Sequence, residues 1–173
     1  MPGWATIGCR AVTARGVPYR GRCLSGSGLD LFVYGTLMVP EVMRTVCGYA
    51  RAGDPALLHD FRRRRVSGEV YPAIVASVGD AVGGILYRGV TPVQLAALDA
   101  FEGAMYRRRM VNVAIRTRVT HAAAYVLAPG HRHVLSEDHW SLEGFVANGL
   151  AAFLEGYPGF TALSDTRGRH DGG

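Results

Sequence analysis

The sequence predicts an α+β domain built around a small, mainly antiparallel β-barrel or curved sheet with short flanking helices. Short apolar or alternating stretches typical of strands outnumber those with helical spacing, and each helical stretch is brief. Nearly half of the 173 residues are hydrophobic, so the chain can bury a sizeable core. The length suits one domain.

In the first half of this domain, strand-like stretches surround one short helix. Leu31–Tyr34 is short and apolar, as a buried strand is. A helix is expected from Pro40 to about Cys47, because proline is favoured in the first turn. Ala56–Val70 contains strand-like stretches around a run of arginines, and Val82–Tyr87 is a strand entered through two glycines.

The clearest helix signal begins at Thr91. Thr91 can cap a helix, Pro92 fits its first position, and Gln94 can complete a capping box. Apolar side chains then recur at helical spacing, at Leu95, Leu98 and Phe101. An amphipathic helix is therefore predicted after Thr91.

Two strands and a last helix are expected in the remaining part of the domain. Met110–Ile115 and His121–Leu127 have the composition of strands, with a hairpin around Arg118–Thr120. The last helix is predicted from Ser141 to about Leu154, where five apolar side chains supply a surface for packing.

The chain is basic, but its charge is unevenly distributed. The net charge is +5, and every basic residue is an arginine. Residues 1–28 contain four arginines and no acid, whereas residues 29–163 contain 13 arginines and 12 acids. Because the excess comes from one arm, it is weak evidence for nucleic-acid binding, and we expect no nucleic-acid partner.

Three parts of the chain are expected: a disordered arm (1–28), a folded domain (29–163) and a disordered tail (164–173). The arm ends in a Ser-Gly repeat typical of flexible linkers. Its arginine-rich, acid-free composition is also that of a transit peptide, but it lacks the apolar segment of a secretory signal.

The sequence indicates no membrane span and a reducing environment. No apolar run approaches the ~20 residues that a membrane helix needs, so we expect no membrane partner. Cys9, Cys23 and Cys47 lack the spacing of metal ligands, and their odd number leaves one thiol unpaired. A cytoplasmic location is therefore expected. Nothing in the sequence indicates an oligomeric state.

Several common motifs are absent, and two charged clusters have plain interpretations. The sequence has no GxSxG, P-loop, GxGxxG or CxxC motif. Residues 131–139 contain three histidines and Asp138, but their spacing matches no strong ligand pattern, so a solvated loop is preferred over a metal site. The run Arg62–Arg65 could bind phosphate or nucleic acid. In a strand, however, alternate side chains point to opposite faces, which favours a solvated, salt-bridged strand.

Glu102 is the most interesting acid in the sequence. It lies near the end of the predicted amphipathic helix, about one turn after Asp99, so both acids can share one face. Gly103 follows as an ordinary helix cap. From the pattern alone, an exposed acid at a helix end is the simpler interpretation.

Gly35 interrupts an apolar strand, where glycine normally costs stability. We interpret it as the point where the strand ends so that backbone amides can face a ligand. Close approach and unusual backbone angles are what glycine allows. A strand-to-helix turn with no ligand is the alternative.

Five short motifs follow one another along the chain. They are Phe32–Leu37 (FVYGTL), Glu69–Ile74 (EVYPAI), Gly84–Tyr87 (GILY), Leu98–Gly103 (LDAFEG) and Tyr106–Arg108 (YRR). This ordered set resembles the γ-glutamylcyclotransferase-like superfamily, over roughly residues 31–127. The resemblance is greatest to the branch named for avirulence-induced plant proteins, which includes γ-glutamylamine cyclotransferases.

The resemblance implies the family's barrel fold and a set of site residues. In the family, the loop after the first strand cradles the α-carboxylate end of a γ-glutamyl group with backbone amides. The acid of the Phe-Glu-Gly motif, here Glu102, is the family's general acid/base. Tyr106 occupies a position where a tyrosine often shapes the pocket. The matching loop residues are Tyr34, Gly35, Thr36 and Leu37, continued by Met38 and Val39.

The implied reaction is the cyclisation of a small-molecule γ-glutamyl amide. The substrate's own α-amine attacks its δ-carbonyl, which forms 5-oxoproline and releases an amine. This chemistry is mainly a matter of orientation and proton transfer, and it requires no metal or organic cofactor. The leaving group stays open, and a non-catalytic metabolite-binding module of the same fold is the alternative.

Overall fold

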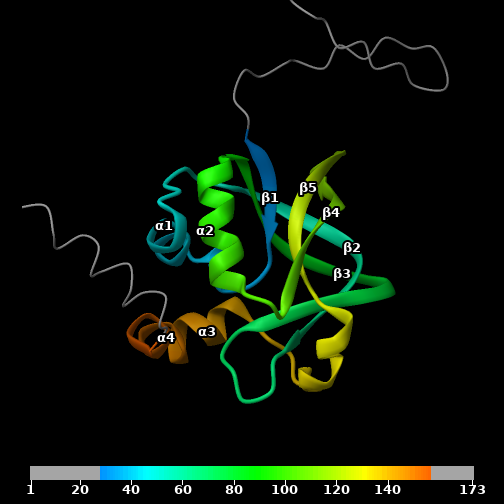
Figure 1. Cartoon of the computed structure of the whole chain (residues 1–173). Helices are drawn as coiled ribbons and strands as arrows, with labels where there is room; N and C mark the ends of the chain where they lie inside the picture. Colours follow the sequence, from blue (N-terminus) through cyan, green and yellow to red (C-terminus); the bar gives the residue numbers. More distant parts are fainter. Residues whose placement is uncertain (1–27, 157–173) are drawn as a thin grey trace, which may run out of the picture.

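A five-stranded barrel lies at the centre of the computed structural model, which describes residues 28–156 (Figure 1). Its strands close in the order β1-β3-β2-β4-β5, and all neighbouring pairs are antiparallel except β1 and β5, which are parallel. The predicted α+β fold with a mainly antiparallel barrel is confirmed. The strands are β1 (Leu29–Val33), β2 (Asp54–Arg65), β3 (Pro72–Val90), β4 (Tyr106–Ile115) and β5 (Arg118–Leu127).

The α-helices gather on one side of the barrel (Figure 1). No helix among residues 28–156 is long and apolar enough to span a bilayer. The predicted tail (164–173), the predicted arm (1–28) except Gly28, and residues 157–163 lie outside the described residues. The helices are η1 (Thr36–Met38), α1 (Pro40–Cys47), α2 (Pro92–Glu102), η2 (Pro129–Val134), α3 (Leu142–Asn148) and α4 (Leu150–Gly156), where η marks a 3₁₀ helix.

The helices α1 and α2 begin at the residues that the local sequence predicted. α1 spans the predicted residues, with Pro40 in its first turn. At the start of α2, the Gln94 N–H donates to Thr91 Oγ1 (3.3 Å) and the Thr91 N–H donates to Gln94 Oε1 (3.0 Å). This reciprocal pair is the predicted capping box. At the other end, Gly103 stops the helix with a positive φ of 68° directly after Glu102.

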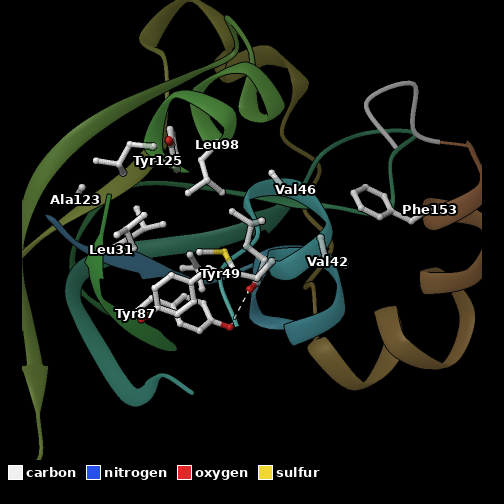
Figure 2. Packing of buried hydrophobic residues seen from close by; sticks show 14 of the residues in the cluster. Leu31, Val42, Val46, Tyr49, Tyr87, Leu98, Ala123, Tyr125 and Phe153 are labelled. Carbon is white, nitrogen blue, oxygen red and sulfur yellow. Dashed lines mark hydrogen bonds between the residues drawn. The ribbon is translucent and has the colours of Figure 1, made fainter. Parts of the chain in front are cut away.

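Three apolar clusters are buried in the described part of the chain. The largest, the outer cluster, lies between the barrel and the helices (Figure 2). A second fills the barrel interior, and a small third one contains Val66, Ala73 and Leu127. Leu31 of β1, Val42 of α1 and Leu98 of α2 belong to the outer cluster and are fully buried. These contacts hold α1 and α2 against the barrel. The residues near the end of α2 are therefore fixed in position.

The strand bounds differ from the prediction in several places: β4 begins at Tyr106 and not at Met110, and β5 begins at Arg118 and not at His121. β3 was expected only over Val82–Tyr87, but it begins at Pro72. The polar residues and Gly79 in its first half break the apolar pattern, yet they pair with β2 around an irregularity between His59 and Phe61. In addition, β2 ends at Arg65 and does not continue to Val70, because a turn with Gly68 at a φ of 79° follows.

Two connections also differ from the expectation. The β4–β5 hairpin was predicted around Arg118–Thr120 but turns at Arg116 and Thr117, because Ile115 pairs with Arg118 and residues 118–120 already belong to β5. The last helix was predicted as one piece but is divided at Gly149 into α3 and α4. Phe145 Cδ2 approaches to 3.0 Å from where a Cβ at Gly149 would lie, so the break packs tightly.

The two glycines at residues 83 and 84 differ sharply in their surroundings, and this difference is testable. A Cβ at Gly84 would lie 2.6 Å from Phe32 Cζ and would also collide with the carbonyl oxygen of Val33, whereas one at Gly83 would meet nothing within 4 Å. Gly84→Ala should therefore lower the free energy of unfolding by about 1–3 kcal/mol through overpacking, measured by chemical denaturation. Gly83→Ala is the matched control, and equal losses in both variants would contradict this packing.

Candidate active site

A small cavity opens between the end of β1, the end of α2 and the start of β4, with a volume of about 80 Å³. Six of the eight site residues predicted from the sequence line it. The structure does not place Met38 or Val39 in its wall. The six are Tyr34, Gly35, Thr36, Leu37, Glu102 and Tyr106.

Gly35 is required by a close approach and not by a left-handed backbone. Its φ is −129°, which any residue can adopt. A Cβ at this position would lie 2.9 Å from Pro72 Cγ and 3.0 Å from Pro72 Cδ. The proline ring therefore packs directly on the glycine, and only a residue without a side chain lets β1 turn into η1 at this distance.

The backbone around Gly35 leaves hydrogen-bond donors available. The carbonyl oxygens of Gly35 and Thr36 accept from the N–H groups of Met38 (2.9 Å) and Val39 (3.1 Å). Within residues 28–156, no acceptor bonds to the N–H groups of Gly35, Thr36 or Leu37. Because backbone donors in folded proteins are nearly always paired, three consecutive unpaired N–H groups beside a cavity indicate a place where a ligand could supply the acceptor.

Glu102 faces the same cavity without a partner of its own. Its carboxylate makes neither a hydrogen bond nor an ion pair with any residue in the described range 28–156. Burial raises the pKa of Glu102 to about 8, and the negative charge of Asp99 adds to the rise. A carboxyl group with this pKa can exchange a proton close to neutral pH, which is the property expected of a general acid/base.

Asp99, one helical turn before Glu102, is held by two partners. The Tyr125 hydroxyl donates to Asp99 Oδ1 (2.7 Å), and Arg108 Nη1 lies 3.1 Å from Asp99 Oδ2. Tyr125 also lines the cavity, so it joins Asp99 to the cavity wall. Burial and the hydrogen bond to Asp99 raise the pKa of Tyr125, which keeps its hydroxyl a donor.

Two tyrosines of the cavity lining donate their hydroxyl groups to backbone carbonyls. The Tyr34 hydroxyl donates to the Tyr125 carbonyl (2.6 Å), which joins the end of β1 to β5. Burial raises the pKa of Tyr34 well above its usual value, so this bond persists at high pH. The Tyr106 hydroxyl donates to the carbonyl of Pro72 (3.0 Å), the residue that packs on Gly35. Tyr106 thus shapes the pocket by fixing the proline.

The family model for "Gamma-glutamyl cyclotransferase, AIG2-like" matches residues 31–142, a range that contains the whole lining of this cavity except Phe153. The chain belongs to this family. The resemblance inferred from the five motifs is thereby confirmed.

Curated AIG2-like relatives come from Arabidopsis thaliana. AIG2-like protein D is 39% identical over 84 residues, which cover 49% of this chain and 55% of that protein. AIG2-like protein C is 40% identical over 91 residues, covering 52% and 53% of the two chains. The present chain therefore spans about half the length of the curated relatives it matches.

Two solved structures have a similar fold. An Arabidopsis thaliana protein determined in solution is 25% identical with a TM-score of 0.59, covering 82% of this chain and 86% of its own. A structure described as "Gamma-glutamyl cyclotransferase" has a TM-score of 0.54 over 79% of this chain and 86% of its own. At 20% identity, that likeness concerns the fold alone.

Sequence reasoning missed several residues of this AIG2-like cavity. Tyr71 and Pro72 belong to the EVYPAI motif, but the sequence assigned no role to them. The contact between Pro72 and Gly35 joins residues that are far apart in the sequence, so no local pattern could indicate it. Tyr125 carries no signal at all, since it is one more large residue in an apolar strand. Five others complete the lining: Phe32, Val33, Phe101, Met105 and Phe153.

The two charged clusters lie outside the cavity. Arg62 pairs with Asp80 (2.8 Å) and Arg64 with Glu137 (3.8 Å), which agrees with a salt-bridged strand. Arg63 and Arg65 instead donate to backbone carbonyls, of Tyr34 and Glu69 respectively. The histidine segment begins as η2, and residues 28–156 contain no group of three or more side chains placed to hold a metal ion.

The raised pKa of Glu102 makes stability depend on pH. The folded pKa of about 8 exceeds the ordinary 4.5, so wild-type stability should fall as pH rises between these values, by at most about 5 kcal/mol. Glu102→Gln cannot ionise and should unfold at a higher temperature than the wild type at pH 9, with the difference vanishing near pH 4. A pH-independent difference in thermal unfolding would contradict the burial of this carboxyl.

Proposed function

We propose that this protein is a γ-glutamyl cyclotransferase that converts γ-glutamyl amides into 5-oxoproline and a free amine. One observation carries the proposal: an acid without a partner and three backbone N–H groups without acceptors line one small cavity. A γ-glutamyl group offers a carboxylate for the donors and an amine for the acid. Membership of the family supports the same reaction class.

The loop at residues 35–37 would bind and orient the substrate, and Glu102 would transfer protons. The N–H groups of Gly35, Thr36 and Leu37 would bind the substrate's α-carboxylate, because backbone amides provide a neutral, preorganised anion site. Held there, the glutamyl chain folds back so that the α-nitrogen approaches its own δ-carbon. Orientation of this kind lowers the barrier without any covalent bond to the protein.

Glu102 would transfer protons in both halves of the reaction. As a carboxylate, it removes a proton from the substrate's α-ammonium group, and the freed nitrogen attacks the δ-carbonyl carbon to form the five-membered ring. Glu102 then gives its proton to the leaving nitrogen as the C–N bond to the amine breaks. The ring nitrogen, which still carries two hydrogens, releases one of them through the freed carboxylate of Glu102 to the departing amine, which leaves as an ammonium ion. The products are 5-oxoproline and the amine, and the acid is again a carboxylate.

The pKa of Glu102 suits this role. Peptide α-amino groups have a pKa of roughly 8, and the α-ammonium group of the substrate has a higher one because a carboxylate lies beside it. The pKa of about 8 for Glu102 brings the two groups much closer together than an ordinary carboxylate would, which lowers the free-energy cost of the proton transfer. The burial of Glu102 would therefore serve catalysis as well as packing.

We predict that Glu102→Gln removes the activity. With wild-type protein, release of 5-oxoproline is measured by mass spectrometry over a panel containing γ-glutamyl-lysine, other γ-glutamylamines and glutathione. Glu102→Gln should lower kcat by about 10²-fold or more while the protein stays folded. Glu155→Gln, which changes an exposed acid on α4, is the matched control. Full turnover by Glu102→Gln would refute its role, and ligand-induced thermal stabilisation without turnover of any substrate would favour the binding module.

We also predict that Asp99 tunes the pH dependence. On the acidic side of its pH profile, kcat/KM should rise with pH as Glu102 loses its proton, with a midpoint near pH 8. This rising part of the profile is called the acid limb. Asp99→Asn removes a negative charge from one helical turn away, so this limb should move to lower pH. Asp138→Asn removes an equal charge outside the cavity and should leave the limb in place. An unchanged limb in Asp99→Asn would show that burial alone sets the pKa.

A further inference from the structure

Arg63 makes a set of contacts that the proposed reaction does not use. Its Nη1 donates to the carbonyl oxygen of Tyr34 (2.7 Å) and lies 3.4 Å from that of Gly83. Its guanidinium carbon lies 5.0 Å from the centre of the Trp140 ring, within the range of a cation–π contact. Burial lowers the pKa of Arg63, so this position is a costly one for a cation. A partly buried cation that is retained despite this desolvation cost is a candidate for a functional role.

The carbonyl that Arg63 holds belongs to the same peptide group as the Gly35 N–H. The described residues contain no cis peptide bond. In a trans peptide, the C=O and N–H bonds point in opposite directions. Gly35 lines the cavity, whereas Arg63, Gly83 and Trp140 do not. Because the Tyr34 carbonyl is directed at Arg63, the Gly35 N–H on the other side of the same peptide is directed toward the cavity.

We propose that Arg63 is a positioning residue that fixes the Tyr34–Gly35 peptide, so that the Gly35 N–H faces the cavity as a donor for the substrate's carboxylate. The identity of that carboxylate rests on the proposed function, but the orientation of the peptide does not. Without Arg63, nothing else in the described part of the chain donates to the Tyr34 carbonyl, and the peptide could rotate its N–H out of the wall.

The site also needs a positive charge that its wall does not contain. Glu102 is the one carboxylic acid among the described lining residues, and they include no arginine or histidine. Arg63 supplies a cation one peptide group away, where it polarises the Tyr34–Gly35 peptide and makes the N–H a stronger donor. An anionic ligand is thus stabilised without a cation in the cavity that could pair with Glu102.

Arginine fits this role better than lysine because its guanidinium is planar. The Trp140 ring, on which it lies, is itself buried and held by a hydrogen bond from Nε1 to the carbonyl of Val70 (2.8 Å). A flat cation can stack on the ring and donate in its own plane to Tyr34 at the same time. Lysine could keep the charge but not both contacts.

The decisive experiment compares Arg63→Met, Arg63→Lys and Arg62→Met. Arg62 is the matched control, because it loses the same charge from the adjacent position but pairs with Asp80 outside the cavity. For a γ-glutamyl substrate turned over by the wild type, Arg63→Met should raise KM by about 10- to 100-fold, with kcat much less affected. Arg63→Lys should lie between Arg63→Met and the wild type, and Arg62→Met should match the wild type. Equal KM values for Arg63→Met and Arg62→Met would overturn the proposal.

A second measurement does not depend on the reaction. In ¹⁵N-glycine-labelled protein without substrate, the Gly35 amide resonance should shift in Arg63→Met and stay in place in Arg62→Met. If the wild type releases no 5-oxoproline but this resonance shifts as expected, the proposed function fails and the positioning role stands. An unshifted Gly35 resonance in folded Arg63→Met overturns the positioning role. If Arg63→Met does not fold, the same resonance in Arg63→Lys decides in the same way.

Discussion

A chain of ring contacts between α2 and β2 holds the two halves of the candidate site together. Phe101, next to Glu102, contacts Phe153 of α4, whose ring contacts Phe145 of α3. Phe145 in turn contacts Trp140, on which the Arg63 guanidinium lies. Since Arg63 binds the Tyr34 carbonyl, this chain connects the acid to the amide loop. It explains why α3 and α4 matter to a site to which they contribute a single lining residue.

The parts of the structure that follow from neighbouring residues were predictable from the sequence. The capping box at Thr91 and the end of α2 at Gly103 depend on side chains within one turn, so α2 and the place of Glu102 at its end could be expected. The motif order then identified the loop at Gly35. What local patterns missed are contacts between distant segments. The Pro72 ring on Gly35 and the Tyr125 hydroxyl on Asp99 each join two strands or a strand and a helix.

The arginine run shows how one pattern can hide four different roles. Arg62 and Arg64 form ion pairs, Arg65 binds a turn, and Arg63 turns inward onto Trp140. Alternation along β2 predicted that the run would not form one patch. It could not predict which arginine would lie on the Trp140 ring, because Trp140 comes from a distant part of the sequence.

The parallel seam between β1 and β5 is the sparsest junction of the barrel, with one bridged pair, Leu31 and Ala123. The Tyr34 hydroxyl bond to the Tyr125 carbonyl lies across this seam, and both tyrosines line the cavity. A molecule seated there therefore spans the junction where the barrel would open first. Occupancy should thus slow amide hydrogen exchange along β1 and β5, including at residues of these strands that do not line the cavity.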